Sequence, residues 1–162
     1  MKNQELLECI IPYSPYGLKA RYKNEMEIET VIAINTKKFE CQTDKRGGLI
    51  SNFKYYLHSL IDIGNPCLEG GKVPIMELLK IKKLDIFDNR PPSEEDDFPN
   101  YKHIGKAKYW FFEVITTPNG IDNLPSWMVT QLIKWNFDIF DLIEKGYAEE
   151  IKTLELSKKN EK

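Results

Sequence analysis

The stretch from Ser126 to Lys145 constrains the fold most, because it is the longest amphipathic segment of the chain. Its apolar residues recur in alternating steps of three and four, which places them on one broad face of a helix. Ser126 is a suitable N-cap residue, and Gly146 can adopt the left-handed conformation that often ends a helix. The sequence therefore predicts a helix over 126–145 that buries Trp135 and Ile139 against the rest of the chain.

The length and composition of the chain fit a single globular domain. A chain of about 150 residues buries roughly 70% of its unfolded surface, so 162 residues allow a sizeable core. No apolar run approaches the roughly 20 residues of a membrane span, and the N-terminal residues carry too short an apolar run for a signal peptide. We therefore expect one domain over 1–156, a disordered tail over 157–162, a cytoplasmic location and no membrane association.

The cysteines and histidines give no sign of a metal site or of catalysis. Cys9, Cys41 and Cys67 are widely spaced and include no CxxC pair, which is typical of small buried side chains in a reducing compartment. A tetrahedral zinc site needs four Cys or His ligands, whereas His58 and His103 stand alone. No motif places a nucleophile beside a partner base. The sequence therefore predicts no metal, no cofactor and no enzymatic activity.

The segments 18–23 and 28–34 alternate between apolar and polar residues, which is typical of half-buried strands. A turn across Asn24–Met26 would join them into an antiparallel hairpin. The expected cross-strand neighbours are Lys23 with Glu27 and Arg21 with Glu29 on the exposed side, and Tyr22 with Ile28, Ala20 with Thr30 and Leu18 with Ile32 on the buried side. A basic stripe such as Lys19, Arg21 and Lys23 binds phosphate only where its charge is uncompensated, so the facing glutamates favour a neutralised hairpin face.

Further segments complete an α+β pattern. Residues 37–42 alternate and predict a third strand, residues 44–48 predict a turn, and residues 74–81 predict a short helix opened by proline. Residues 49–63 fit both helical and strand spacing, so periodicity leaves this segment open. The dense apolar run over 109–115 predicts a central strand buried on both faces. We expect a mostly antiparallel sheet covered by the C-terminal amphipathic helix.

The segment 85–99 is an acidic loop inserted into this pattern. It contains three prolines and six acidic residues against one arginine, a net charge of −5, so the remainder of the −2 chain carries +3. Such a loop is either a solvated excursion over a mildly basic body or an arm that docks in a basic groove. On the second interpretation, the partner-binding residues are Glu94, Glu95, Asp96 and Asp97. Their spacing does not fit a calcium loop, which alternates its oxygen ligands around a central glycine.

Basic and aromatic residues are mixed just after the acidic loop. Proteins that bind single-stranded nucleic acid combine cations for the phosphates with aromatic rings for base stacking. Aromatic residues within an apolar run are, however, more often core residues than stacking platforms. The residues of this candidate nucleic-acid site are Lys102, Lys106, Lys108, Tyr109 and Trp110.

The sequence contains three familiar blocks: IPYSPYGLK at 11–19, KYYLHSLIDI at 54–63, which GKVPI at 71–75 follows, and WNFDIFDLI within 124–154. They resemble the IPYLPYGLK, KPILRPLSDL and WHFDVFGLI segments of a family of small uncharacterised phage and prophage proteins. The resemblance favours a strand over 54–57 and implies a mobile-element setting with an accessory role. The chain departs from the family at four positions, with His58 in place of arginine, Ser59 of proline, Asn136 of histidine and Asp141 of glycine.

The predicted function is that of a non-enzymatic phage or prophage accessory protein, which binds and inhibits a host antiviral defence effector in the manner of an anti-CRISPR protein. The expected partner is a host defence protein such as a CRISPR effector nuclease. Its basic groove would attract the acidic loop over about 8 Å, the Debye length at physiological salt. The alternative is a nucleic-acid-binding accessory protein of a phage or mobile element.

Overall fold

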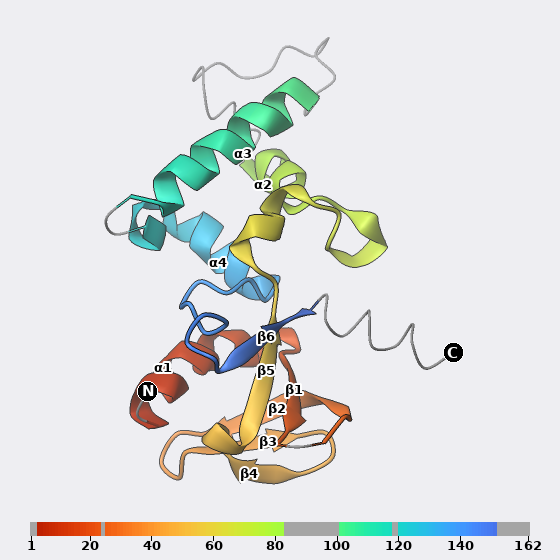
Figure 1. Ribbon diagram of the computed structural model, residues 1–162, viewed down its shortest axis with the longest axis vertical. Coiled ribbons are helices and arrows are strands. Elements are labelled where there is room, and N and C mark those ends of the chain that lie inside the picture. Colours follow the sequence, from red (N-terminus) through yellow and green to blue (C-terminus); the bar gives the residue numbers. More distant parts are fainter. Residues whose placement is uncertain (1–2, 24, 83–100, 118–119, 152–162) are drawn as a thin grey trace. The chain divides into compact units, whose positions relative to one another are not determined.

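The computed structural model describes residues 3–23, 25–82, 101–117 and 120–151, and this part of the chain is α+β, as predicted (Figure 1). It contains four α-helices and six strands, and the six strands form one mostly antiparallel sheet. The chain divides into two compact units, one of residues 1–59 with 132–162 and the other of residues 60–131. The acidic loop predicted over 85–99 and the tail predicted over 157–162 lie outside the described residues.

The sheet belongs to the unit that contains both termini. Its strands are β1 (Lys19–Tyr22), β2 (Ile28–Asn35), β3 (Glu40–Thr43), β4 (Gly47–Leu49), β5 (Phe53–Leu57) and β6 (Ala148–Glu150). Their order is β4-β3-β2-β1-β5-β6, and every neighbouring pair is antiparallel except β5 with β6. The strand expected over 54–57 is confirmed by β5, and β4 and β6 are the two edges of the sheet.

The β1–β2 hairpin has a register one residue away from the predicted one. Ala20 pairs with Glu29, whereas the sequence predicts Arg21 opposite Glu29. The connection is longer than three residues because Lys23 leaves the hairpin, and its N–H donates to the carbonyl of Asn52 at 2.8 Å. A shift of one residue reverses the face on which the paired side chains lie. Glu29 is consequently buried beside Ala20 instead of lying on the exposed face.

A β-bulge in β2 changes which apolar side chains face solvent. The register between β2 and β3 shifts between Val31 and Ala33, so that Ile32 falls in the bulge. Ile32 is 60% exposed, although the alternation of the sequence predicts that it is buried opposite Leu18. Ala33 is exposed as well. The bulge therefore presents two consecutive apolar side chains to solvent.

Helix α1 (Asn3–Ile10) packs its apolar face into the core of the sheet unit. Its buried residues are Leu6, Leu7 and Ile10. The helix continues directly into a 3-10 helix over Ile11–Tyr16, in which Tyr13 is wholly buried. The Tyr13 hydroxyl donates to the carbonyl of Phe137 at 2.7 Å and accepts the N–H of Ile139 at 3.1 Å. Tyr13 thus fixes the N-terminal segment to the C-terminal part of the same unit.

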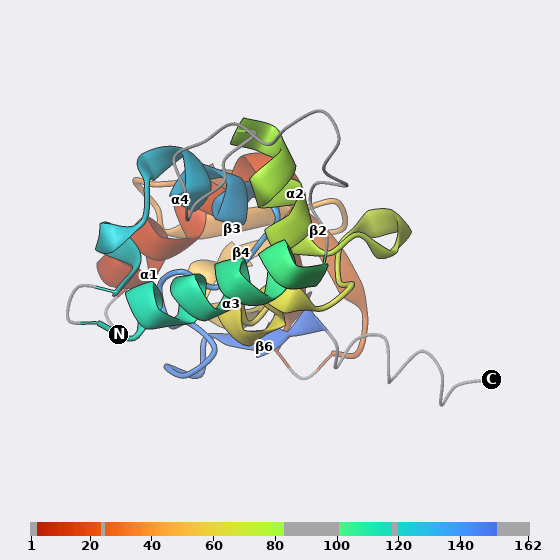
Figure 2. The ribbon, with the colours of Figure 1, turned by 90° about the horizontal axis from the view of Figure 1, so that it is seen from above.

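The unit of residues 60–131 is helical in its described part, and helices α2 (Pro74–Lys82) and α3 (Tyr101–Ile115) lie side by side in it (Figure 2). The helix predicted over 74–81 is confirmed by α2. The central strand predicted over 109–115 is wrong, because this run is the second half of α3. Ala107 and Phe111 are wholly buried four residues apart, which is the period of a helix. None of the helices described combines the length and the apolar character that a bilayer span requires.

Helix α4 (Ser126–Lys134) begins where the sequence predicts but ends eleven residues earlier than predicted, before the irregular segment 135–147. After the end of α4, two backbone groups bond to His58 instead of continuing the helix. The N–H of His58 donates to the carbonyl of Asn136 at 2.8 Å, and its carbonyl accepts the N–H of Asp138 at 2.9 Å. Asn136 and Asp141 both have φ of +57°, outside the helical region. The predicted helical cover over 135–145 is therefore not formed, although Ile139 is buried as predicted.

Candidate functional site

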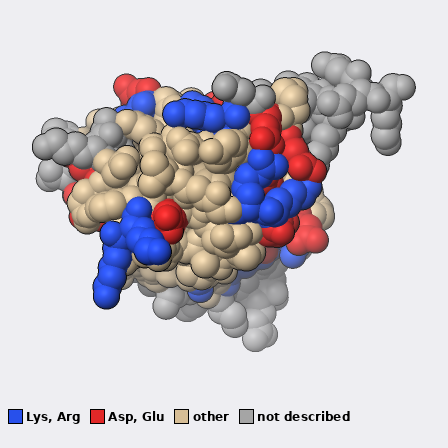
Figure 3. All heavy atoms as spheres, turned by 90° about the horizontal axis from the view of Figure 1, so that it is seen from below, with Lys and Arg blue, Asp and Glu red and all other residues tan. Residues whose placement is uncertain are grey.

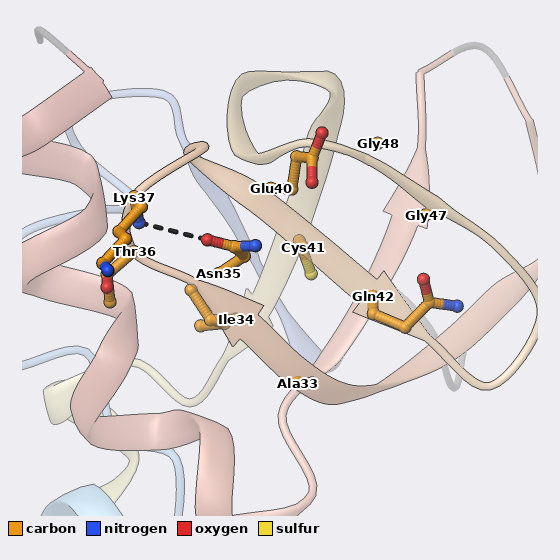
Figure 4. Close-up of a pocket in the computed structure, with 10 residues that line it drawn as sticks. All are labelled: Ala33, Ile34, Asn35, Thr36, Lys37, Glu40, Cys41, Gln42, Gly47 and Gly48. Carbon is orange, nitrogen blue, oxygen red and sulfur yellow. Dashed lines mark hydrogen bonds between the residues drawn. The ribbon is translucent and has the colours of Figure 1, made fainter.

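A hollow of about 710 Å³ lies beside strands β2, β3 and β4 (Figure 4). The last residues of β2 and the turn that follows form one part of its wall, and β3 and β4 form the remainder. Its lining residues are Ala33, Ile34, Asn35, Thr36, Lys37, Glu40, Cys41, Gln42, Gly47 and Gly48. The hollow thus lies at the end of the sheet where β4 is the edge strand.

The turn between β2 and β3 is held by the side chain of Asn35. Its Oδ1 accepts the N–H groups of Lys37 and Lys38, each at 3.1 Å, in a turn of the kind that asparagine favours. Phe39 has φ of +55°, and its carbonyl accepts the N–H of Ile50 at 2.9 Å as the chain enters β3. Both lysines are exposed, and neither ammonium group has an ion-pair partner among the residues that the structure describes.

Cys41 is one of the lining residues, and its thiol is buried. Burial raises the pKa of this thiol to about 11, although a hydrogen bond from Tyr55 acts in the opposite direction. The hydroxyl of Tyr55 also donates to the carbonyl of Ile50 at 3.0 Å. Because the thiolate is the nucleophilic form, this raised pKa disfavours a nucleophilic role of Cys41 at neutral pH.

The other end of the β3–β4 hairpin carries a cluster of paired charges. Arg46 contacts Glu25 at 2.5 Å, and its Nε lies 2.7 Å from Oε1 of the buried Glu29, without the alignment of a hydrogen bond. The hydroxyl of Thr43 donates to the other carboxylate oxygen of Glu29 at 2.5 Å. This cluster holds the hairpin together and leaves little charge for a partner.

The ion pairs predicted across the β1–β2 hairpin are replaced by others. Arg21 pairs with Glu149 of β6 at 2.8 Å instead of with Glu29, and Glu27 pairs with Lys45 instead of with Lys23. These partners are distant in sequence, so no alternation within the hairpin could identify them. The basic stripe is nevertheless neutralised at Arg21, which agrees with a structural role for this residue.

Seen from below, one face of the molecule has few Lys, Arg, Asp or Glu side chains in its middle (Figure 3). In that view, charged residues gather mostly at the margins. The strand register places Gly47, Gln42 and Ala33 in one row across the three strands, and Leu49, Glu40 and Asn35 in the next. Leu49 is 46% exposed, and Ile32 in the bulge lies next to Ala33. Exposed apolar side chains therefore lie next to residues that line the hollow.

The sequence offered no signal for this site. Gly47 and Gly48 fall in the segment for which the sequence predicts a turn, and three residues of the composition GGL show no periodicity. They form a strand because Cys41 pairs with Gly48 and extends the ladder. The bulge at Ile32 likewise depends on the register with β3, which a single strand does not reveal.

The candidate sites predicted from sequence are placed as follows. Glu94, Glu95, Asp96 and Asp97 lie outside the described residues, and Lys102 lies in the first turn of α3, with its side chain outside the description. In a strand, Lys106 and Lys108 would share a face, but on the helix they diverge. Lys106 is exposed, and Tyr109 is 67% exposed three residues further on. Trp110 is half-buried.

Lys108 lies on a different side of α3 from Lys106. A Cβ added at Gly64 would lie within 2.6 Å of Lys108 Cδ, so the lysine stem packs over that glycine. The Lys108 ammonium also lies 5.9 Å from the centre of the Phe112 ring. The helix therefore separates the predicted basic and aromatic set, and leaves Lys106 and Tyr109 as its exposed members.

The buried titratable groups of the sheet unit hold the fold. Both carboxylate oxygens of Asp138 are occupied, because Oδ1 accepts the N–H of Leu142 and Oδ2 that of Ile143, each at 2.8 Å. Burial raises the pKa of Tyr13, whose hydroxyl is bonded to two backbone groups. Across the described residues, no group of three or more His, Cys, Asp or Glu side chains is arranged to hold a metal ion.

Comparison with known proteins adds no assignment to this geometry. No family model, no curated protein and no solved structure matches the chain. The function is therefore argued from the contacts of the described residues and from the sequence blocks.

Proposed function

We propose that this chain is a non-enzymatic accessory protein of a phage or prophage that acts by binding a host protein. The observation that carries protein binding is the hollow beside β2, β3 and β4, together with the exposed apolar side chains of Ile32 on β2 and Leu49 on β4. Exposed apolar side chains within a polar rim are typical of protein–protein interaction sites. Leu49 lies on the edge strand β4, and Ile32 lies on β2, two strands further into the sheet.

The use made of the reactive side chains supports binding over catalysis. Cys41 is a buried thiol with a raised pKa, and Tyr13 and Asp138 are each bonded to backbone groups. A catalytic nucleophile or base needs access to substrate and a free lone pair. The thiol, the hydroxyl and the carboxylate of these three residues therefore stabilise the fold by packing or by hydrogen bonds to the backbone.

The phage setting is supported by the way two of the resembling blocks meet. Tyr13 of the IPYSPYGLK block hydrogen-bonds to Phe137 and Ile139 of the WNFDIFDLI block. Asn136 and Asp141, which stand where the family has histidine and glycine, both have φ of +57°. Glycine adopts this region freely, and Asn, Asp and His are the other residues enriched there. The substitutions are thus compatible with one shared backbone conformation.

The proposed partner is a host antiviral defence effector, such as a CRISPR effector nuclease in the host cytoplasm. The sequence supports this class through the −5 charge of residues 85–99, which suits a basic nucleic-acid groove. Glu94, Glu95, Asp96 and Asp97 are the proposed contacts of this acidic segment. The apolar face and the acidic segment would then be two separate parts of one binding surface or two alternative ones.

A pull-down from bacterial host lysate tests the proposal and distinguishes the two surfaces. The wild-type protein is expected to capture a defence effector and to reduce its cleavage of target nucleic acid. The variant Ile32→Lys with Leu49→Lys should lose at least about tenfold in captured effector if the apolar face binds, as charges in an interface core do. Met26→Lys is the matched control, because Met26 is 77% exposed on the β1–β2 connection.

The variant with Glu94, Glu95, Asp96 and Asp97 all changed to Ala tests the acidic segment in the same assay. Loss of capture in this variant alone would assign binding to the segment and not to the sheet face. Capture of no defence effector by the wild-type protein would contradict the proposed function as a whole.

The second candidate function is binding of single-stranded nucleic acid through α3. The observation that favours it is the pair Lys106 and Tyr109, which are exposed three residues apart on one helix face. Lys106→Glu should then abolish a gel shift at low salt, whereas Lys108→Glu should have a smaller effect because its stem packs over Gly64. Absence of any shift with wild-type protein would contradict this function.

A further inference from the structure

Strand β4 presents unpaired backbone groups at the edge of the sheet. The N–H of Thr43 donates to the carbonyl of Arg46 at 2.7 Å, and the N–H of Ile50 donates to the carbonyl of Phe39 at 2.9 Å. Backbone groups of successive residues alternate in direction along a strand, so Arg46, Gly48 and Ile50 face β3. Gly47 therefore turns its N–H and carbonyl outward, and Leu49 turns its N–H outward.

The edge strand β4 contains neither proline nor a charged residue, although it is short, with three residues. Natural sheets protect their edges with short edge strands, with proline, with charged side chains or with a covering element. Strand β4 consists of two glycines and an exposed leucine, and it stands last in the strand order. In the part of the chain that the structure describes, no hydrogen bond beyond the sheet ladder is made by the outward groups of Gly47.

The Leu49 end of the edge is positively charged. Glu40 pairs with Leu49, so the turn with Lys37 and Lys38 lies at this end. Their ammonium groups lack ion-pair partners among the described residues, and Glu40 adds one exposed carboxylate opposite Leu49. Two cations against one anion favour an acidic group in whatever occupies the edge.

We propose that β4 takes up an extended segment of a partner protein as an added antiparallel strand. The proposal rests on the proposed protein-binding function and specifies its mode. Main-chain hydrogen bonds would form with Gly47 and Leu49, and one apolar side chain of the segment would pack beside the exposed Leu49. An antiparallel segment brings its N-terminal residues to the Leu49 end, so acidic residues should precede its apolar alternation.

Two synthetic peptides provide the test with the full-length labelled protein. One is acetyl-Asp-Asp-Val-Thr-Val-Thr-amide, and the other, acetyl-Thr-Val-Thr-Val-Asp-Asp-amide, has the same composition with its acids at the other end. Amide hydrogen exchange at Gly47 and Leu49 should slow at least about tenfold when the first peptide binds, whereas Gly48 should change little because its N–H already faces β3. The first peptide should also bind about threefold to tenfold more tightly than the second.

Variants check the same contacts independently. Leu49→Lys should weaken binding of the first peptide about tenfold, and Lys37→Glu with Lys38→Glu should remove its advantage over the second. Met26→Lys, on the distant connection, should leave both affinities unchanged. The exchange pattern of the wild-type protein needs no variant, so it stands even if Leu49→Lys does not fold.

Several outcomes would overturn strand addition, and they differ from failure of the proposed function. Binding of a peptide without protection of Gly47 and Leu49 would overturn the mode, as would failure of both peptides at about millimolar concentration, the usual limit for weak contacts. Protection of these amides that rises with protein concentration alone would show a second copy as the occupant. In each case, capture of a defence effector in the pull-down would still support the function.

Discussion

Two buried carboxylates of the sheet unit are stabilised in different ways. Glu29, in the regular strand β2, faces a cation and a hydroxyl, because Arg46 and Thr43 converge on it. Asp138, in the irregular segment 135–147, accepts backbone N–H groups, among them those of Leu142 and Ile143. Burial of a charge is costly unless it is paired or hydrogen-bonded, and the chain meets this requirement in both ways.

The difference shows what each carboxylate does for the fold. Glu29 joins side chains of a sheet that backbone hydrogen bonds already define. In a helix, the N–H groups of Leu142 and Ile143 would donate to backbone carbonyls. Here they donate to the Asp138 carboxylate, so the path of the chain after α4 depends on this side chain. The segment with the less regular backbone should therefore depend more on its single carboxylate.

The largest expected effect is that of Asp138→Ala. It leaves two buried N–H groups without acceptors, each at a cost of about 1–3 kcal/mol, so the free energy of unfolding should fall by about 3 kcal/mol. Urea unfolding followed by fluorescence measures this. On the helix predicted from sequence, Asp138 would lie on the wet face, and alanine would stabilise by a few tenths of a kcal/mol. An unchanged or raised stability would therefore contradict the structure of this segment.

A smaller loss, about 2 kcal/mol, is expected for Glu29→Ala, because the Thr43 hydroxyl and the Arg46 Nε lose a buried partner. Glu27→Ala is the matched control two residues earlier on the same chain segment, where the carboxylate is exposed and pairs with Lys45. That change should cost no more than about 0.5 kcal/mol. Equal effects of the two changes would favour the predicted register, in which both glutamates lie on the exposed face.

The elements that the sequence predicts correctly carry strong local signals. Pro74 at the first turn marks the start of α2, and Ser126 marks that of α4. The family resemblance favoured the strand over 54–57, which periodicity had left open and which is formed as β5. In each of these, the residues that decide the structure lie within the element itself.

The elements that the sequence misplaces depend on distant residues. The hairpin register is set by the bond from Lys23 to Asn52, and α4 ends where His58 bonds to Asn136 and Asp138. The run at 109–115 fits both periods, and only packing of Ala107 and Phe111 decides for a helix. The sequence did not predict the candidate site for the same reason. Residues 47–49, two glycines and a leucine, form an edge strand only because they pair with β3.

The smallest expected effect is a pH dependence of stability that comes from Asp138. Burial raises the pKa of the Asp138 carboxyl above its usual range, although the N–H groups of Ile143, Leu142 and Phe140 act in the opposite direction. Between the unfolded and the folded pKa, the native state holds a proton that the unfolded chain has lost. Stability contributed by Asp138 should therefore fall as pH rises through this window and stay constant above it.

The control is Asp138→Asn, which keeps one acceptor oxygen and does not titrate. The difference in unfolding free energy between wild-type protein and this variant, measured in urea from pH 3.5 to 7, isolates the contribution of one group from those of the other carboxylates. Wild-type protein should lose stability relative to the variant as pH rises through the acid range. A difference that is constant with pH, or that changes in favour of the wild-type protein, would show that the amides balance or outweigh burial at Asp138.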